Sequence, residues 1–199
     1  KKYTKQIMLS KITFGSCLVV AAMAKCESPK LVEDFNAMKY MGTWYDVRKT
    51  KDCIYAPIEA TCEQNIMSNL DVETGKFDMI TSFQLPEKNS RDEISFAGKC
   101  PTNEAACYMS FFGISTMTPN YTVIDTDYTD YALVYSCNWF LQKEVLHILS
   151  RNPTPSEADF EDYMIKAQTA LPKFDFDSFA PRSVQGETCN YQELATFSQ

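Results

Sequence analysis

Histidine is the scarcest reactive residue of this chain: among 199 residues there is one, His147. A single imidazole excludes metal sites built from histidine clusters and most acid–base schemes that use two histidines. The chain also lacks a Gly-x-Ser-x-Gly elbow, so a serine triad around His147 has no nucleophile in its usual setting. The chain has no Cys-x-x-Cys pair, the spacing that would indicate a zinc site. The sequence therefore implies no cofactor and no metal.

Long apolar runs are also missing. The best candidate, Ile12–Ala24, follows the positive Lys11 and ends in an Ala-x-Ala sequence. It is too short to span a bilayer, and its form is typical of a secretory signal peptide; a buried helix is the alternative. We therefore expect an N-terminal extension and signal peptide over residues 1–24, and one secreted domain over residues 25–199 with no membrane span.

Positive charge is in short supply as well. The chain has 19 lysines and arginines against 26 acidic residues, a net charge of −7. Removing residues 1–24 would take away four lysines and no acid, which gives −11. A chain this acidic repels phosphate backbones and anionic lipid surfaces, so we expect no nucleic-acid partner.

What the chain has is a series of short runs rich in β-branched and aromatic residues, separated by polar turns. The expected strands are Thr43–Lys49, Ala60–Ser68, Lys76–Gln84, Glu93–Gly98, Cys107–Gly113, Tyr121–Asp125, Tyr131–Cys137 and Val145–Ser150. This spacing indicates an all-β sandwich or barrel without choosing between them.

One segment follows a different pattern. Thr154-Pro155-Ser156-Glu157 combines a threonine cap, a proline at the first helical position and a glutamate three residues after the cap. The apolar residues that follow recur at helical spacing: Phe160, Tyr163, Ala167 and Leu171. We expect an amphipathic helix packed on the sheet, which favours a barrel over a sandwich. Phe174 and Phe176 alternate after it, which suggests a short ninth strand.

Three short motifs occur in a fixed order along the chain. Gly42-Thr43-Trp44-Tyr45 comes first, Thr126-Asp127-Tyr128 forms a turn before a late strand, and Arg151 closes the last apolar run. Together they resemble the signatures of the lipocalin family, over about Asp34 to Cys189. The resemblance implies an eight-stranded antiparallel up-and-down barrel with a C-terminal helix packed on the sheet. It also implies that Trp44 plugs the closed end of the barrel and that Arg151 lies across its indole ring.

Seven cysteines remain after residue 24. Cys100 and Cys107 flank a polar loop between two strand-like runs, so a local disulfide is plausible there. The lipocalin resemblance implies two more, Cys26–Cys137 and Cys62–Cys189. Cys53 is left over, and either an intermolecular disulfide or replacement of Cys62 in the tail bridge would use it.

The pocket wall follows from alternation, because neighbouring side chains of a strand point to opposite faces. It should be mostly apolar with a few polar anchors. The expected ligand-binding residues are Tyr55, Phe77, Met79, Phe83, Phe96, Tyr121, Val123, Val134, Ser136, Val145 and His147. Burial of His147 among Val134, Val145 and Leu149 should lower its pKa.

The expected function is that of a carrier, not an enzyme, for a small hydrophobic ligand such as a retinoid, sterol, fatty acid or pigment. A protein receptor is a second kind of partner. Two alternatives stay open. An enzyme could use Cys53, whose thiolate the nearby Lys49 and Lys51 would favour, as a barrel cysteine does in an enzymatic lipocalin. A barrel filled by its own aromatic residues would instead serve interaction or defence. Asn120-Tyr121-Thr122 is a glycosylation sequon, so we expect a glycoprotein.

Overall fold

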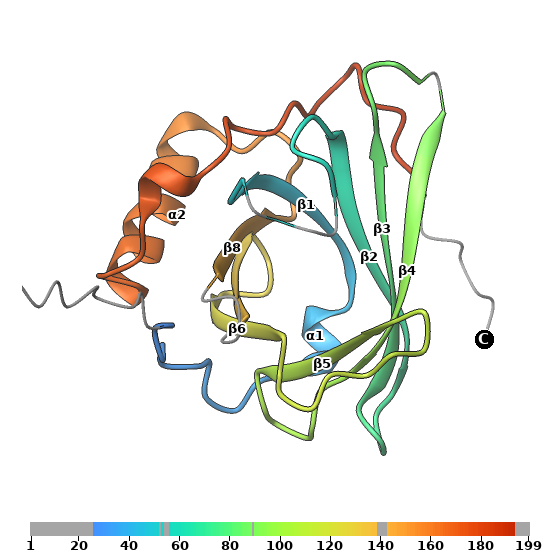
Figure 1. Cartoon of the computed structure of the whole chain (residues 1–199), viewed down its shortest axis with the longest axis vertical. Coiled ribbons are helices and arrows are strands. Elements are labelled where there is room, and N and C mark those ends of the chain that lie inside the picture. The colour runs from blue at the N-terminus through green and yellow to red at the C-terminus, as the bar shows by residue number, and fades with distance from the viewer. Residues whose placement is uncertain (1–25, 52, 54–55, 89, 139–142, 194–199) are drawn as a thin grey trace, which may run out of the picture.

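The chain folds into a closed antiparallel barrel in which each strand pairs with the next and β8 returns to β1 (Figure 1). The structure is a computed structural model that describes residues 26–51, 53, 56–88, 90–138 and 143–193. The strands are β1 (Gly42–Lys49), β2 (Thr61–Asp71), β3 (Lys76–Gln84), β4 (Arg91–Lys99), β5 (Ala106–Phe111), β6 (Tyr121–Thr126), β7 (Tyr131–Asn138) and β8 (Lys143–Ser150). The short helix α1 (Ala37–Tyr40) precedes them, and α2 (Glu157–Ala170) and the 3-10 turn η1 (Phe176–Ser178) follow.

The predicted fold class is confirmed, and all eight expected strands exist with ends shifted by a few residues. The expected signal peptide and N-terminal extension lie outside the described residues. Within the described part of the chain, no helix has the length and apolar character that crossing a membrane requires.

The barrel wall separates two apolar cores, and β7 shows how. Ala132 and Val134 point inward and pack in the interior with Trp44. Tyr131, Leu133 and the other residues of opposite parity point outward beneath α2, which lies outside the barrel in Figure 1. The buried stripe of α2 is the one that the sequence predicts, Phe160, Tyr163 and Ala167, continued by Leu171. Because side chains alternate along β7, its inner face contributes to the pocket wall and its outer face packs against α2.

Two local expectations about the C-terminal segment are wrong. Ser156 caps α2, not Thr154: its side chain accepts a hydrogen bond from the backbone N–H of Asp159. Both residues are good caps, and the helix begins where the hydroxyl reaches a free N–H group. The expected ninth strand is instead the turn η1, because Phe176 and its neighbours pack as a cluster against the outer core rather than alternating along a sheet edge.

The closed end is organised around Arg151. Its guanidinium lies 3.6 Å from the centre of the Trp44 ring, as the resemblance implies. It also donates hydrogen bonds to the carbonyl oxygens of Thr43, Met41 and Tyr128 at 2.8, 2.9 and 3.2 Å. The Trp44 indole N–H donates to the carbonyl of Tyr40 at 2.8 Å. One cation therefore joins α1, β1, β8 and the turn between β6 and β7.

The three expected disulfides are present. Cys26–Cys137 ties the N-terminal segment to β7, and Cys62–Cys189 ties the C-terminal tail to β2. Cys100–Cys107 closes the short connection between β4 and β5. The first two close loops of more than one hundred residues, for which chain-entropy arguments give about 4–5 kcal/mol of stabilisation each. Among the described residues, Cys53 is the free cysteine.

Arg151→Lys tests the closed end. Lysine keeps the charge but cannot stack on Trp44 while donating to several carbonyls, so the free energy of unfolding should fall by about 2–4 kcal/mol. Chemical denaturation followed by tryptophan fluorescence measures it. Arg182→Lys is the matched control, because Arg182 also lies over an aromatic ring, Phe160 at 4.1 Å, but at the surface. Equal losses in the two variants would contradict the role given to Arg151.

Candidate functional site

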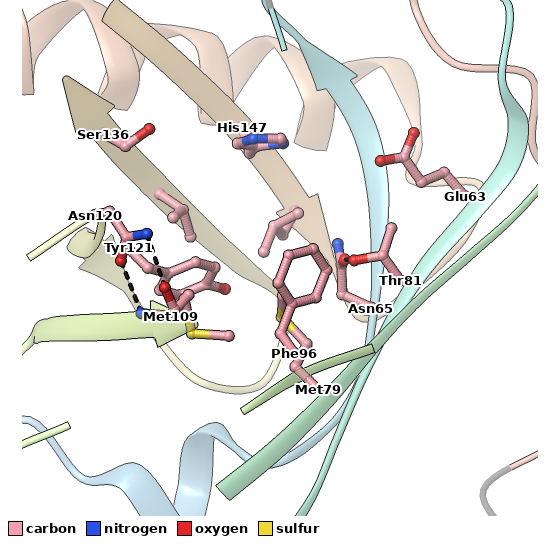
Figure 2. A pocket seen from close by; sticks show the side chains of 12 residues that line it. Glu63, Asn65, Met79, Thr81, Phe96, Met109, Asn120, Tyr121, Ser136 and His147 are labelled. Atoms are coloured by element: carbon pink, nitrogen blue, oxygen red, sulfur yellow. Dashed lines mark hydrogen bonds between the residues drawn. The ribbon is translucent and has the colours of Figure 1, made fainter. Parts of the chain in front are cut away.

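A cavity occupies the middle of the barrel (Figure 2). Trp44 and Tyr40 belong to the same interior core as its apolar lining residues. Residues from seven strands and one connection line the cavity: Glu63, Asn65, Met79, Thr81, Phe96, Met109, Asn120, Tyr121, Val134, Ser136, His147 and Leu149. The volume of the cavity is about 40 Å³. The cavity is therefore narrow.

The lining is divided along the barrel axis. Figure 2 shows Met79, Phe96 and Met109 together at the deeper end, and Glu63 and His147 toward the open end. At the base, the hydroxyl groups of Tyr121 and Tyr40 lie 3.0 Å apart. Between the ends, Thr81 donates a 2.6 Å hydrogen bond to the side chain of Asn65. An elongated ligand would thus place an apolar portion inward and a polar portion toward the mouth.

A chain of three polar side chains stands at the open end. His147 on β8 contacts Asp46 on β1 through Nδ1, at 2.6 Å from Oδ2. Its other nitrogen, Nε2, lies 3.8 Å from the sulfur of Cys53, in the connection between β1 and β2. Asp46 is fully buried, and within the described residues its Oδ1 has no hydrogen-bond partner. The carboxylate orients the ring, and the ring presents an N–H or a lone pair to the thiol.

A second buried pair adjoins this chain. Lys49 on β1 and Glu63 on β2 form an ion pair, with 3% and 2% of their side chains exposed. The two pairs lie next to each other because Asp46 and Lys49 belong to the same strand, with a bulge between Asp46 and Arg48. The described side chains form no group of three that could hold a metal ion.

These groups shift one another's pKa values. Burial lowers the pKa of His147, but the Asp46 carboxylate and Cys53 outweigh it and hold that pKa well above its ordinary value. Burial raises the pKa of Cys53, but His147 and Lys49 outweigh it and the net shift is downward. Burial, helped by Asp46 and opposed by Lys49, raises the pKa of Glu63 to about 7. The expected lowering of the His147 pKa is thus wrong, since desolvation alone does not decide it.

Six of the predicted wall residues line the cavity. They are Met79, Phe96, Tyr121, Val134, Ser136 and His147. Strand alternation selected Met79, Val134, Ser136 and His147 because β3, β7 and β8 keep the same inward-facing positions at this level of the barrel. Phe96 is a candidate without an assigned face. That these residues bind a ligand stays a prediction.

The other predicted wall residues lie elsewhere in the barrel or outside the described chain. Phe77 packs at the closed end over Gly98, where an added Cβ would come within 2.3 Å of its ring. Val123 is fully buried in the same closed-end core. Phe83 packs nearer the mouth against Ala56 and Ala60 of the β1–β2 connection, which covers it. Parity gives a residue's face but not its depth.

Two further positions complete this account. Val145 pairs with Ser136 near the mouth but is not among the residues that line the cavity. Tyr55 lies outside the described residues. Neither position therefore contributes a wall contact that the structure describes.

The predicted wall omits Asp46 beside His147 and six residues that line the cavity: Glu63, Asn65, Thr81, Met109, Asn120 and Leu149. Asp46 shares inward parity with Trp44, and that signal could have found it. Glu63 and Asn65 lie on β2, where six consecutive residues are buried and no alternation shows the inner face. Met109 on β5 has the same parity as Cys107 and could have been included.

The sequon residue Asn120 has its side-chain amide engaged in the barrel. Its Oδ1 accepts from the N–H of Met109 at 2.7 Å and its Nδ2 donates to the carbonyl of Met109 at 3.0 Å. Nδ2 is the atom that would carry a glycan. Glycosylation at Asn120 stays a prediction.

The sequence of this chain is similar to a known protein family and to individual proteins. The sequence profile described as "Lipocalin / cytosolic fatty-acid binding protein family" matches residues 41–169. Rat (Rattus norvegicus) apolipoprotein D is 31% identical over 136 residues, which cover 66% of this chain and 68% of that protein. The match spans most of the barrel and the helix.

Solved structures agree on the fold. Insecticyanin from the tobacco hornworm Manduca sexta superposes with a TM-score of 0.67 at 18% identity, covering 83% of this chain and 89% of that one. Lobster apocrustacyanin A1 gives a TM-score of 0.62 at 21% identity, over 78% and 83% of the two chains. At these identities the likeness shows a shared barrel.

The raised pKa of Glu63 predicts how stability depends on pH. Between about pH 4.5 and 7, the folded protein retains a proton on Glu63 that the unfolded chain has released. This contribution therefore favours folding at low pH and is lost as pH rises toward 7. Relative to Glu63→Gln, the wild-type protein should lose on the order of 2 kcal/mol between pH 5 and 7.5.

Denaturant titrations at the two pH values measure this difference. Glu104→Gln removes an exposed carboxyl in the β4–β5 connection and should run parallel to wild type. If Glu63→Gln also runs parallel, Glu63 does not hold a proton in the folded protein at neutral pH.

Proposed function

The chain belongs to the lipocalin family, and on that premise we propose that it is a carrier that binds a small hydrophobic ligand inside its barrel. The single observation that supports this most is the division of the cavity, with Met79, Phe96 and Met109 inward and His147 and Glu63 at the mouth. Apolar walls with a few polar anchors are the usual composition of small-molecule sites. The ligand is best sought among amphiphilic lipids with one polar end, such as retinoids, fatty acids and sterols.

Ligand entry requires rearrangement of the wall. The volume of the cavity is about 40 Å³, whereas sites for drug-sized ligands commonly have volumes of several hundred Å³. Met79 and Met109 face this space, and methionine side chains change rotamer easily. The cavity can therefore widen by side-chain rotation without moving the strands.

The narrow cavity also supports a second candidate, a barrel filled by its own side chains that acts through its surface. Phe96 and Phe111 pack with ring centres 5.4 Å apart near the cavity, which shows how aromatic residues occupy the interior. In that case no apolar ligand would bind, and the function would be interaction or defence through a protein partner. Ligand titration separates the two candidates.

We further propose that the protein works outside the cell. Three disulfides support this, because such bonds persist in oxidising compartments. The signal-like sequence of residues 1–24 supports it as well. The net charge of −7 is unfavourable for nucleic acid and anionic membranes, so a free ligand in solution is the partner that fits best.

Val134→Phe tests whether the cavity is the binding site. The wild-type protein should bind retinol, a fluorescent fatty acid or a steroid with a dissociation constant in the micromolar range or below. Fluorescence titration measures this binding. A phenylalanine at Val134 fills part of the cavity, so affinity should fall at least about tenfold, which is roughly 1.4 kcal/mol.

Val72→Phe is the matched control, because Val72 is 61% exposed in the β2–β3 turn and the same enlargement there meets solvent. Circular dichroism confirms that both variants fold. If no probe binds wild type saturably, the filled barrel replaces the carrier. If Val134→Phe binds as wild type does, the ligand occupies another site.

A further inference from the structure

The polar chain at the mouth is more elaborate than ligand anchoring requires. Cys53, His147 and Asp46 stand in series, with 3.8 Å from sulfur to Nε2 and 2.6 Å from Nδ1 to Oδ2. This is the order of nucleophile, base and orienting carboxylate that activates cysteines in enzymes. The three residues come from the β1–β2 connection, β8 and β1, so they meet because the barrel closes.

We propose that Cys53, His147 and Asp46 form a covalent capture site for apolar α,β-unsaturated carbonyl compounds that enter the barrel. The inference rests on the proposed carrier function, because the apolar tail of the ligand must occupy the cavity beside His147. Cys53 is partly buried and its partner His147 lines that cavity. A ligand seated with its polar end at the mouth therefore brings its carbonyl portion beside the thiol.

Conjugate addition is the reaction that these groups can complete unaided. The Cys53 thiolate forms a carbon–sulfur bond to the β-carbon of the ligand, while the π-electron pair of the carbon–carbon double bond moves toward the carbonyl oxygen. The imidazolium of His147 then gives its Nε2 proton to the α-carbon, and the neutral ring remains bound to Asp46. The product is a thioether that retains its carbonyl. No leaving group, water, oxidant or further reactant takes part.

The surrounding charges favour the ionised starting state. Asp46 and Lys49 face the pair from β1, Glu63 faces it from β2, and His147 itself comes from β8. The imidazolium and the Lys49 ammonium stabilise the thiolate, while Asp46 stabilises the imidazolium. Glu63, with a pKa of about 7, adds less negative charge than an ordinary carboxylate would. Among the residues that the structure describes, Oδ1 of Asp46 has no hydrogen-bond partner, so this oxygen keeps the capacity to accept a bond beside the ring.

The test uses the disulfide-intact mature chain and 3-nonen-2-one, an enone with an apolar tail. Intact-mass spectrometry should show one added molecule per chain, and peptide mapping should place it on Cys53. Because His147 and Lys49 lower the pKa of Cys53, the rate should rise by less than about tenfold per pH unit from pH 6 to 8. An ordinary thiol would react about tenfold faster per pH unit over that range.

Variants show whether His147 and Asp46 activate Cys53 or whether Cys53 is only an accessible thiol. Asp46→Asn and His147→Gln should slow the addition at least about tenfold at pH 6.5 and restore a steep rise with pH. Asp34→Asn, which removes an exposed carboxylate in the segment before α1, should leave the rate and the pH profile unchanged. Cys53→Ser should abolish addition yet still bind the saturated ketone 2-nonanone, which shows that it folds and keeps its cavity.

Capture and carriage fail in different ways. Protection of Cys53 by 2-nonanone against the long enone, but not against methyl vinyl ketone, would support the proposal. If 2-nonanone binds but Cys53 stays unmodified, or reacts with the pH profile of an ordinary thiol, the capture site is overturned and the carrier stands. If Cys53 reacts with methyl vinyl ketone while 2-nonanone neither binds nor protects, carriage fails and selective capture of apolar enones fails with it.

Discussion

The barrel depends on the cation that closes its lower end. Arg151 stacks on Trp44 and donates to the carbonyl oxygens of Met41, which ends α1, and of Thr43 on β1, so one side chain joins these segments to the end of β8. Gly42 permits this approach, because its φ of +98° suits glycine and an added Cβ would lie 3.2 Å from the guanidinium. The first strand, the last strand and the cavity floor are thereby fixed relative to one another, and the depth of the cavity follows from that.

The sequence predicts those features of the structure that follow a regular pattern along the chain. Period-two patterns located the strands and the inward set on β3 and β7, and motif resemblance placed Trp44 against Arg151. It failed where long-range contacts decide. Asp46 is 101 residues from His147, so nothing local announces a partner that reverses the direction of the histidine's pKa shift. Phe77 has the expected parity, but its depth depends on Gly98 of the neighbouring strand.

The buried polar groups at the floor of the cavity are neutral, whereas those at its mouth include charged groups. At the floor, Tyr40 and Tyr121 share a hydrogen bond and stay neutral, since burial raises the pKa of each well beyond its ordinary range. At the mouth, charges are retained in pairs, and His147 with Asp46 shows the arrangement most clearly. Buried pairs rarely add much net stability, because desolvation offsets their attraction. Their presence beside a thiol is consistent with a chemical role.

The two long disulfides also determine how the molecule carries mechanical load. Tension applied to the two ends of the chain reaches the bridges at Cys26 and Cys189, which join it to Cys137 and Cys62. The two shortest covalent paths between Cys26 and Cys189 run through the segment from Cys26 to Cys62 and through the segment from Cys137 to Cys189. Strands β3 to β6, which supply the apolar end of the cavity, lie on neither of these two paths. Pulling on the ends therefore loads the two short segments before it loads the wall that carries Met79 and Met109.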